Sequence, residues 1–191
     1  MDTLLKKEFD IHRVAGSKHP LLEEYGLDAV PFKHEKIDQW RENFVGVRHL
    51  HIPTNFLVFG AIDDVWVNPQ GELIVVDYKA TSKDGKITLD ADWQIVYKRQ
   101  MEIYQWLLRK NGFKVSETGY FVYCNGRRDL EAFDKKIEFD VSLIPYKGRN
   151  DSWIDKTLVD IRECLESEEI PEPSHECEYC AYTDEVQKAT F

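Results

Sequence analysis

Two runs of β-forming residues on either side of a turn signal constrain this chain more than any other feature. The first run, FLVFGAIDDVWV, covers residues 56–67, and the second, LIVVDYKA, covers residues 73–80, with NPQGE between them. Asn, Pro and Gly are typical of tight turns, so the two runs are expected to pair as an antiparallel hairpin. Because side chains alternate along a strand, Asp77 and Lys79 share one face of the second run.

Asp63 in the first run is expected to converge with Asp77 when the hairpin closes. Two carboxylates a few Å apart repel each other unless a cation or a proton lies between them. Mg²⁺ takes oxygen ligands, commonly one or two carboxylates with substrate phosphates, and an adjacent Lys79 ammonium offsets developing negative charge. The set indicates metal-dependent phosphodiester hydrolysis. The plainer interpretation is an Asp that begins a turn and a salt bridge between Asp77 and Lys79. Asp64 faces the other way in a regular strand and is the second choice of ligand.

The remaining patterns place this hairpin in an α/β protein. Apolar residues at helical spacing predict helices over residues 2–14, 34–44, 93–112 and 151–167. Alternating apolar and polar residues predict further strands over residues 118–126 and 135–146. The order is helix, helix, strand, strand, long helix, strand, strand, helix. It predicts an α/β fold with a central mixed β-sheet flanked by helices.

Size and charge narrow the classes of function. The chain has 191 residues, 42% of them hydrophobic, which suits a single domain over residues 1–191 with a full core. Its formal net charge of -10 disfavours a nucleic-acid partner on bulk charge alone. Basic residues still cluster locally, and Lys98 and Arg99 in the long helical pattern are candidates for DNA binding. Without a membrane-spanning apolar run or a signal peptide, a cytoplasmic location is expected.

Three motifs in order resemble those of the PD-(D/E)xK nuclease superfamily. Within it they are similar to the RecB-like branch, which includes the CRISPR-adaptation and RecB/AddB nuclease domains. The strand motifs are GAID at residues 60–63 and VVDYKA at residues 75–80. Gln100 and Tyr104 supply the Gln-x-x-x-Tyr motif that follows, and their spacing puts them on one helix face.

The resemblance implies a restriction-endonuclease-like core and a Mg²⁺- or Mn²⁺-dependent deoxyribonuclease. We expect a single-strand-preferring exonuclease of DNA repair, recombination or defence, with a helicase as a natural partner. A catalytically weakened nucleic-acid-binding or partner-binding module on the same fold is the alternative. The catalytic residues that the resemblance implies are Asp63, Asp77, Lys79, Gln100 and Tyr104.

The N-terminal metal ligand departs from the pattern of this branch. Its members usually carry a histidine ligand on a helix near the N-terminus, and the corresponding position here falls near Asp2. Asp2 is therefore the expected third ligand beside Asp63 and Asp77, and Glu8 is the alternative.

Cys177 and Cys180 form a Cys-x-x-Cys pair in a C-terminal tail at about residues 171–191. Without a secretion signal, a close pair favours metal binding over a disulfide. In RecB-like relatives such cysteines join N-terminal cysteines around a [4Fe–4S] cluster, which needs four thiolates. We expect the partners in an N-terminal segment that this chain lacks. The alternatives are a partial Zn²⁺ site with His175 and two free thiols.

Overall fold

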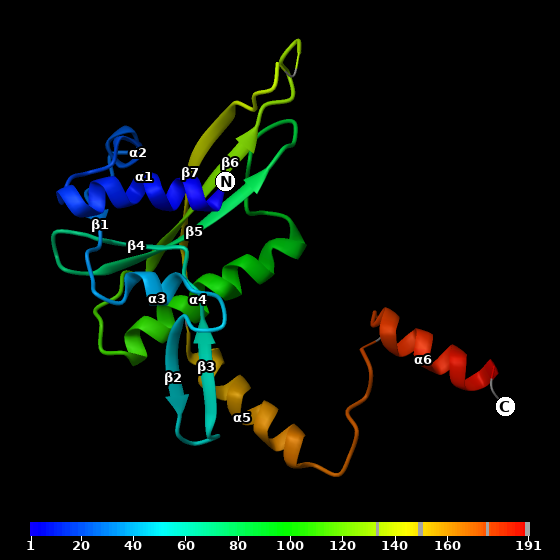
Figure 1. Cartoon of the computed structure of the whole chain (residues 1–191). Coiled ribbons are helices and arrows are strands. Elements are labelled where there is room, and N and C mark those ends of the chain that lie inside the picture. The colour runs from blue at the N-terminus through cyan, green and yellow to red at the C-terminus, as the bar shows by residue number, and fades with distance from the viewer. Residues whose placement is uncertain (133, 149–150, 175, 190–191) are drawn as a thin grey trace.

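The computed structural model describes residues 1–132, 134–148, 151–174 and 176–189. At its centre lies a five-stranded sheet with the order β1-β4-β5-β6-β7 (Figure 1). Strands β5 and β6 are parallel and the other neighbours are antiparallel, which confirms the predicted mixed sheet. The five strands are β1 Val30–Pro31, β4 Asp64–Val67, β5 Leu73–Thr81, β6 Thr118–Gly126 and β7 Phe139–Lys147.

Helices cover both faces of this sheet, and a small second sheet lies beside it (Figure 1). The second sheet pairs β2 Val47–His51 with β3 Phe56–Gly60 in antiparallel fashion. The helices are α1 Asp2–Ala15, α2 Pro20–Glu24, α3 Ile37–Arg41, the 3-10 turn η1 Asp92–Gln94, α4 Ile95–Lys110, α5 Ser152–Glu166 and α6 Glu178–Ala189.

Successive side chains of β5 point to opposite faces of the sheet, and each face packs on an apolar core of its own. Val75 belongs to the core between the sheet and α4, whereas Val76 belongs to the core between the sheet and α1 and α2. Continuing the alternation, Asp77 and Lys79 face α4, and Tyr78 joins the core on the α1 side. The functional face of β5 is therefore the face that α4 covers.

The first β-type run is not one strand, contrary to the expectation from sequence. Its first half, β3, pairs with β2, and only the part from Asp64 onward enters the central sheet as β4. Gly60 marks the break, because a Cβ there would lie 2.6 Å from Cε1 of Tyr104. A Cβ on Gly46 would lie 2.2 Å from the Gly60 carbonyl oxygen, so glycine at both positions permits the close crossing. The partner strand β2 was not expected from sequence.

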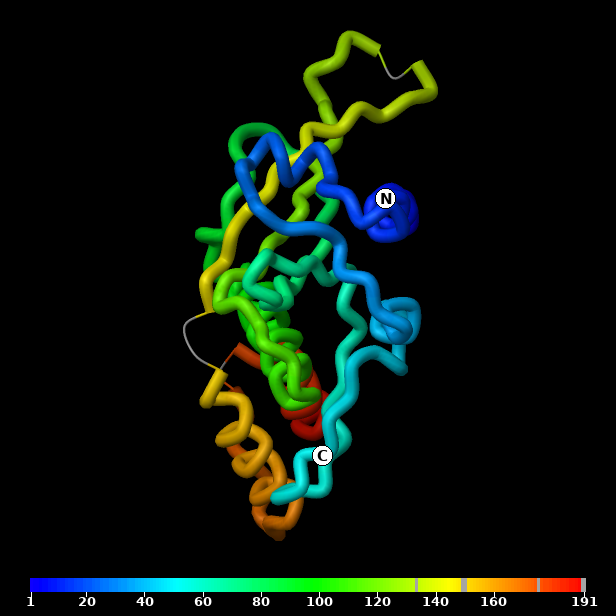
Figure 2. Tube along the Cα trace, turned by 90° about the vertical axis from the view of Figure 1, so that its left-hand side faces the viewer, coloured from blue at the N-terminus to red at the C-terminus, as the bar shows by residue number. Residues whose placement is uncertain are grey.

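The C-terminal segment is also more regular than the sequence indicates. Residues 178–189 form the helix α6, none of whose described residues is buried, and Figure 1 shows it apart from the sheet. His175 lies outside the described residues. At the top of both views, the described parts of the β6–β7 connection project beyond the sheet (Figures 1 and 2). Within the described residues, no helix has both the length and the apolar character that crossing a membrane requires.

Candidate active site

Asp77 and Lys79 form an ion pair on the α4 side of β5. Nζ of Lys79 lies 2.5 Å from Oδ2 of Asp77, whose side chain is 3% exposed. Burial raises the pKa of Asp77 to about 6, with Lys79 opposing the rise and Asp63 adding to it. The contact is a short ion pair, and Oδ2 has no further hydrogen-bond donor among the described residues. This buried oxygen has the chemistry of a cation ligand.

Asp63 lies in the bend immediately before β4 and next to Asp77. Asp64 pairs with Val76 in the ladder, so Asp63 comes at the level of Asp77. The Asp63 side chain bonds directly to the backbone of β5: its Oδ2 accepts a hydrogen bond of 2.8 Å from the backbone N–H of Tyr78. Burial raises the pKa of Asp63, and the Tyr78 N–H partly offsets that rise. The sharp bend, and not a regular strand, aims this carboxylate.

A chain of hydrogen bonds from α4 holds Lys79. Nζ donates to Oε1 of Gln100 at 3.2 Å, and Nε2 of Gln100 donates to the hydroxyl of Tyr104 at 2.8 Å. The same Nζ lies 4.4 Å from the ring centroid of Tyr97, a cation–π contact. Burial raises the pKa of Tyr104 to about 12, so its phenol stays neutral. The helical motif thus reaches the lysine through its amide and orients the ammonium.

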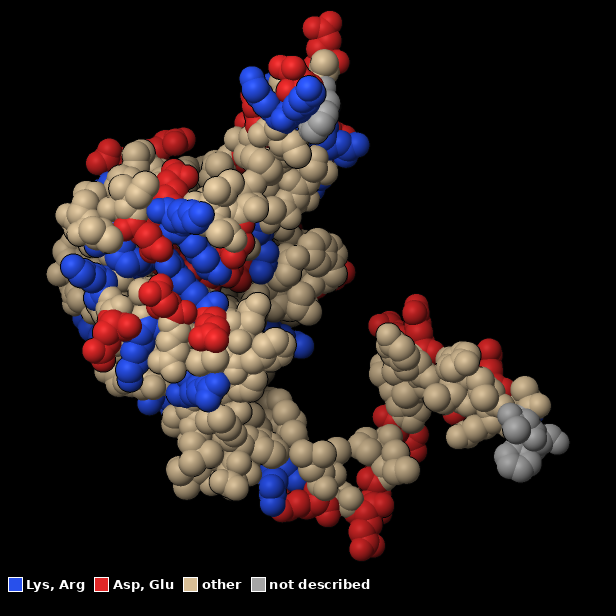
Figure 3. Space-filling model, viewed as in Figure 1, with Lys and Arg blue, Asp and Glu red and all other residues tan. Residues whose placement is uncertain are grey.

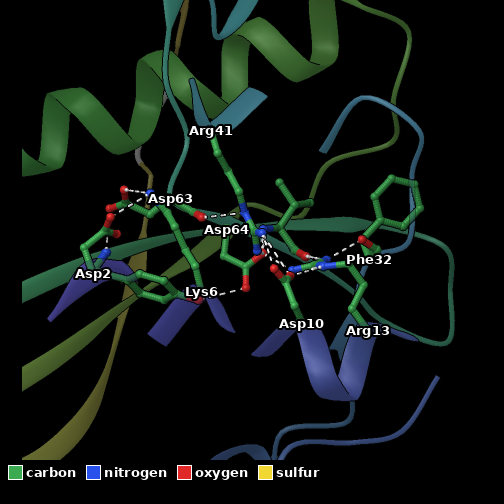
Figure 4. A network of polar contacts seen from close by, with 10 residues as sticks. Asp2, Lys6, Asp10, Arg13, Phe32, Arg41, Asp63 and Asp64 are labelled. Carbon is green, nitrogen blue, oxygen red and sulfur yellow. Dashed lines mark hydrogen bonds and ion pairs between the residues drawn. The ribbon is translucent and has the colours of Figure 1, made fainter. Parts of the chain in front are cut away.

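Lys6 of α1 stands between Asp2 and Asp63 (Figure 4). Its Nζ lies 2.9 Å from Oδ2 of Asp2 and 3.5 Å from Oδ1 of Asp63. The structure therefore brings Asp2 to the edge of the site through an ammonium. Glu8, the alternative, contacts Nε2 of His19 at 3.0 Å instead.

Asp64 faces away from the site and anchors a network that sequence reasoning missed. It is fully buried, pairs with Arg13 and Arg41, and accepts the hydroxyl of Tyr78 at 2.8 Å (Figure 4). Arg41 also donates from Nε to the backbone oxygen of Asp63 at 3.1 Å. Arg41 thereby ties the bend that carries Asp63 to the core on the α1 side. The sequence held one signal of this network, the second Asp of the Asp63-Asp64 pair. If that carboxylate is buried, it needs a cationic partner elsewhere in the chain.

The donor set at this site suits one hard cation with few protein ligands. Mg²⁺ and Mn²⁺ are held by oxygen, and Mg²⁺ needs only one or two carboxylates when waters and phosphate complete its shell. Asp63 and Asp77 meet that need. Within the described residues, no group of three or more His, Cys, Asp or Glu side chains is arranged to hold a metal.

The cysteine pair lies away from this site, at the start of α6. Cys177 and Cys180 are half-exposed free thiols, and the pKa of Cys177 is lowered by hydrogen bonds from Cys180. Cys124 is buried in β6 and Cys164 is exposed on α5. A [4Fe–4S] cluster takes four thiolates, and Cys177 and Cys180 supply two. The hydrolysis of a phosphodiester at Asp63 and Asp77 needs no such cluster.

Lys98 and Arg99 lie on the first half of α4. Lys98 is half-buried and Arg99 is exposed, and both line a hollow between α4 and the start of α5. Figure 3 shows Lys and Arg interspersed with Asp and Glu over the body of the molecule, whereas the segment that leads to α6 is mainly acidic. The negative net charge is therefore unevenly distributed, and basic side chains are present on the body of the molecule.

A mixed sheet between helices, with Asp77 and Lys79 on β5 and Asp63 in the bend before the adjoining β4, is typical of the restriction-endonuclease-like class of folds. The profile of the PD-(D/E)XK nuclease superfamily matches residues 4–184, and the chain belongs to this superfamily of metal-dependent nucleases.

Among solved structures, the chain is similar to one named "Crystal structure of SSO0001", with 21% identity and a TM-score of 0.35. The match covers 68% of this chain and 50% of that chain, so this chain matches about half the length of that protein. The search of curated proteins found no match.

Proposed function

We propose that this chain is a single-domain, RecB-like deoxyribonuclease that degrades DNA from single-stranded ends. The observation that carries the proposal is the buried Oδ2 of Asp77, which has the Lys79 ammonium at 2.5 Å and no further hydrogen-bond donor among the described residues. A carboxylate with a raised pKa, next to a second carboxylate and a lysine, is a costly arrangement that serves catalysis better than stability. Membership of a nuclease superfamily supplies the reaction class.

In this proposal Asp63 and Asp77 hold one Mg²⁺ or Mn²⁺ ion. The ion, when bound, polarises the scissile phosphate and lowers the pKa of a water molecule. Lys79 stabilises the negative charge that develops on the phosphate oxygens as water adds and one P–O ester bond breaks. Gln100 and Tyr104 keep the Lys79 ammonium in place during that step. An enzyme that acts on single-stranded ends depends on unwound DNA, so a helicase is the partner we propose.

Cleavage of labelled DNA tests this proposal. The purified chain is incubated with 5′- and 3′-labelled single-stranded and duplex DNA, and with RNA of the same sequence, in Mg²⁺, Mn²⁺ or EDTA. We expect metal-dependent cutting of single-stranded DNA that Asp77→Asn and Lys79→Met reduce by at least about 100-fold. Asp160→Asn, an exposed carboxylate on α5, is the matched control. Equal cutting in EDTA, or by both variants, would refute the proposal, and the ladder gives the polarity.

Lys6 favours a second candidate, a nucleic-acid-binding module with weakened catalysis. Its ammonium lies 3.5 Å from Oδ1 of Asp63, close to where this branch carries a histidine ligand. A positive charge there opposes the entry of a dication. Retained DNA binding without cutting in any metal would select this candidate over the nuclease.

A further inference from the structure

A hollow of about 380 Å³ lies between the end of β3 and the side of α4 that carries Gln100 and Tyr104. Its volume falls within the range of small-ligand pockets. The side chains that line it are Phe59, Val96, Arg99, Gln100, Ile103 and Tyr104.

This hollow adjoins the catalytic lysine through shared residues. Gln100 and Tyr104 form part of its wall and also belong to the hydrogen-bonded chain that reaches Lys79. Gly60 follows Phe59 and packs so closely on the Tyr104 ring that a Cβ would not fit. A ligand in the hollow therefore lies next to the groups that hold Lys79.

The hollow joins exposed apolar surface to positive charge. Phe59 is 45% exposed and Val96 is 56% exposed, although both are large apolar side chains. Arg99 is exposed at the same hollow, and the Arg48 guanidinium lies 5.9 Å from the centroid of the Phe59 ring. Arg48 lies over the Phe59 ring and Arg99 lines the same hollow, so a partly exposed aromatic ring with positive charge nearby suits a ligand with a flat face and an anionic chain.

We propose that this hollow binds the unpaired nucleobase next to the scissile phosphate of single-stranded DNA. Phe59 stacks on the base, and Arg99 pairs with the phosphate that follows it. A base inside a duplex is stacked and paired, and it would have to be extruded before it could enter. The hollow thus selects single strands. This inference rests on the proposed function, because it places the substrate of that same site.

Binding without metal tests the inference apart from cleavage. Fluorescence anisotropy in EDTA measures the Kd of a fluorescein-labelled 12-nucleotide single strand and of the matching duplex. We expect Phe59→Ala to weaken single-strand binding about tenfold, the size of one lost base stack, and to change duplex binding little. Phe59→Tyr should restore binding. Leu57→Ala, on the same exposed face of β3 but outside the hollow, should bind like the wild type.

A second pair of variants guards against a folding defect. Val96→Glu puts a carboxylate into the hollow and should weaken single-strand binding, whereas Ile95→Glu, its neighbour outside the hollow, should not. Thermal melting checks that each variant is folded. Equal effects of Phe59→Ala and Leu57→Ala, or equal losses for single strand and duplex, would overturn the inference. So would a wild-type chain that binds no single strand at low salt.

The outcomes also separate this inference from the proposed function. If the wild-type chain cuts DNA in a metal-dependent way but Phe59→Ala binds and cuts normally, the inference alone is wrong. If binding depends on Phe59 but no metal supports cutting, the hollow stands as a binding site and the nuclease proposal fails.

Discussion

Lys79 and Asp77 share one face of β5, with Nζ of the lysine 2.5 Å from Oδ2 of the acid. The lysine partly neutralises a carboxylate that burial has made costly, and burial still raises the pKa of Asp77 to about 6. A second carboxylate, Asp63, adds to that rise. The ionised Asp77 therefore lowers the stability of the folded protein, and a further cation would offset this loss.

Replacing Asp77 should stabilise the metal-free protein. Its pKa is about 6 when folded and near 3.8 when unfolded, so the folded state binds more protons between these values. Stability is therefore lost as pH rises from about 4 to about 6, and it stays low above that range. Two pKa units correspond to about 3 kcal/mol, and we expect Asp77→Asn to gain about 1–3 kcal/mol at pH 8 in EDTA. Urea unfolding at pH 4 and pH 8 measures the gain, which should be small at pH 4. An equal gain at both pH values would contradict this assignment, and Asp160→Asn is the control.

Divalent metal should stabilise the folded chain in a pH-dependent way. A ligand that binds only the folded state at 100 times its Kd adds about 2.7 kcal/mol to the free energy of unfolding. The Asp77 carboxylate must be deprotonated to bind metal, so the effect of Mn²⁺ on Tm should shrink as pH falls below about 6. Thermal melts with and without Mn²⁺ at pH 5 and pH 8 test this. A Tm shift of the same size at pH 5 would show that the metal binds elsewhere.

Asp64 should contribute stability and not a metal ligand. Removing its charge leaves Arg13 and Arg41 with Asp10, a partly exposed carboxylate, as their remaining ion-pair partner among the described residues. We expect Asp64→Asn to lower the free energy of unfolding by about 3 kcal/mol, the usual cost of breaking a buried ion pair from one side. Because Arg41 also binds the Asp63 carbonyl, Mn²⁺ should bind more weakly as well. Unfolding titrations beside Asp160→Asn measure the loss. An unchanged free energy of unfolding would show that the Asp64 network does not stabilise the fold.

Lys6 should compete with the metal. Its ammonium occupies Oδ1 of Asp63 and pairs with Asp2. Partly exposed ion pairs contribute up to about 1 kcal/mol, so Lys6→Gln should tighten Mn²⁺ binding about three- to fivefold. Calorimetric titration of Lys6→Gln beside Lys7→Gln, an exposed lysine on the same helix, measures the change. Weaker binding in Lys6→Gln would mean that the ammonium positions Asp63.

Local sequence patterns predicted much of the fold. The β4–β5 hairpin and the shared face of Asp77 and Lys79 follow from a turn signal and from alternation, which act over a few residues. The i, i+4 spacing of Gln100 and Tyr104 likewise fixes one helix face before any tertiary contact forms. Strand β6 spans the residues that the alternation predicted.

Long-range contacts account for what sequence reasoning missed. The break after Gly60 depends on the Tyr104 ring, 44 positions further along, and on a partner strand, β2, without a strong signal of its own. The pairing of Asp64 with Arg13 joins residues 51 positions apart. No local pattern distinguishes an arginine that enters a core from one that stays in solvent.

Mn²⁺ binding to the intact chain tests the central claim most directly. Calorimetric titration at pH 8 compares the wild type with Asp63→Asn, Asp77→Asn and Asp160→Asn. We predict one site in the wild type and in Asp160→Asn, weakened at least about tenfold in each of the other two variants, since each loses one of two protein ligands. A wild type that binds no Mn²⁺, or affinities unchanged by Asp63→Asn and Asp77→Asn, would contradict the assignment of these carboxylates as the metal site.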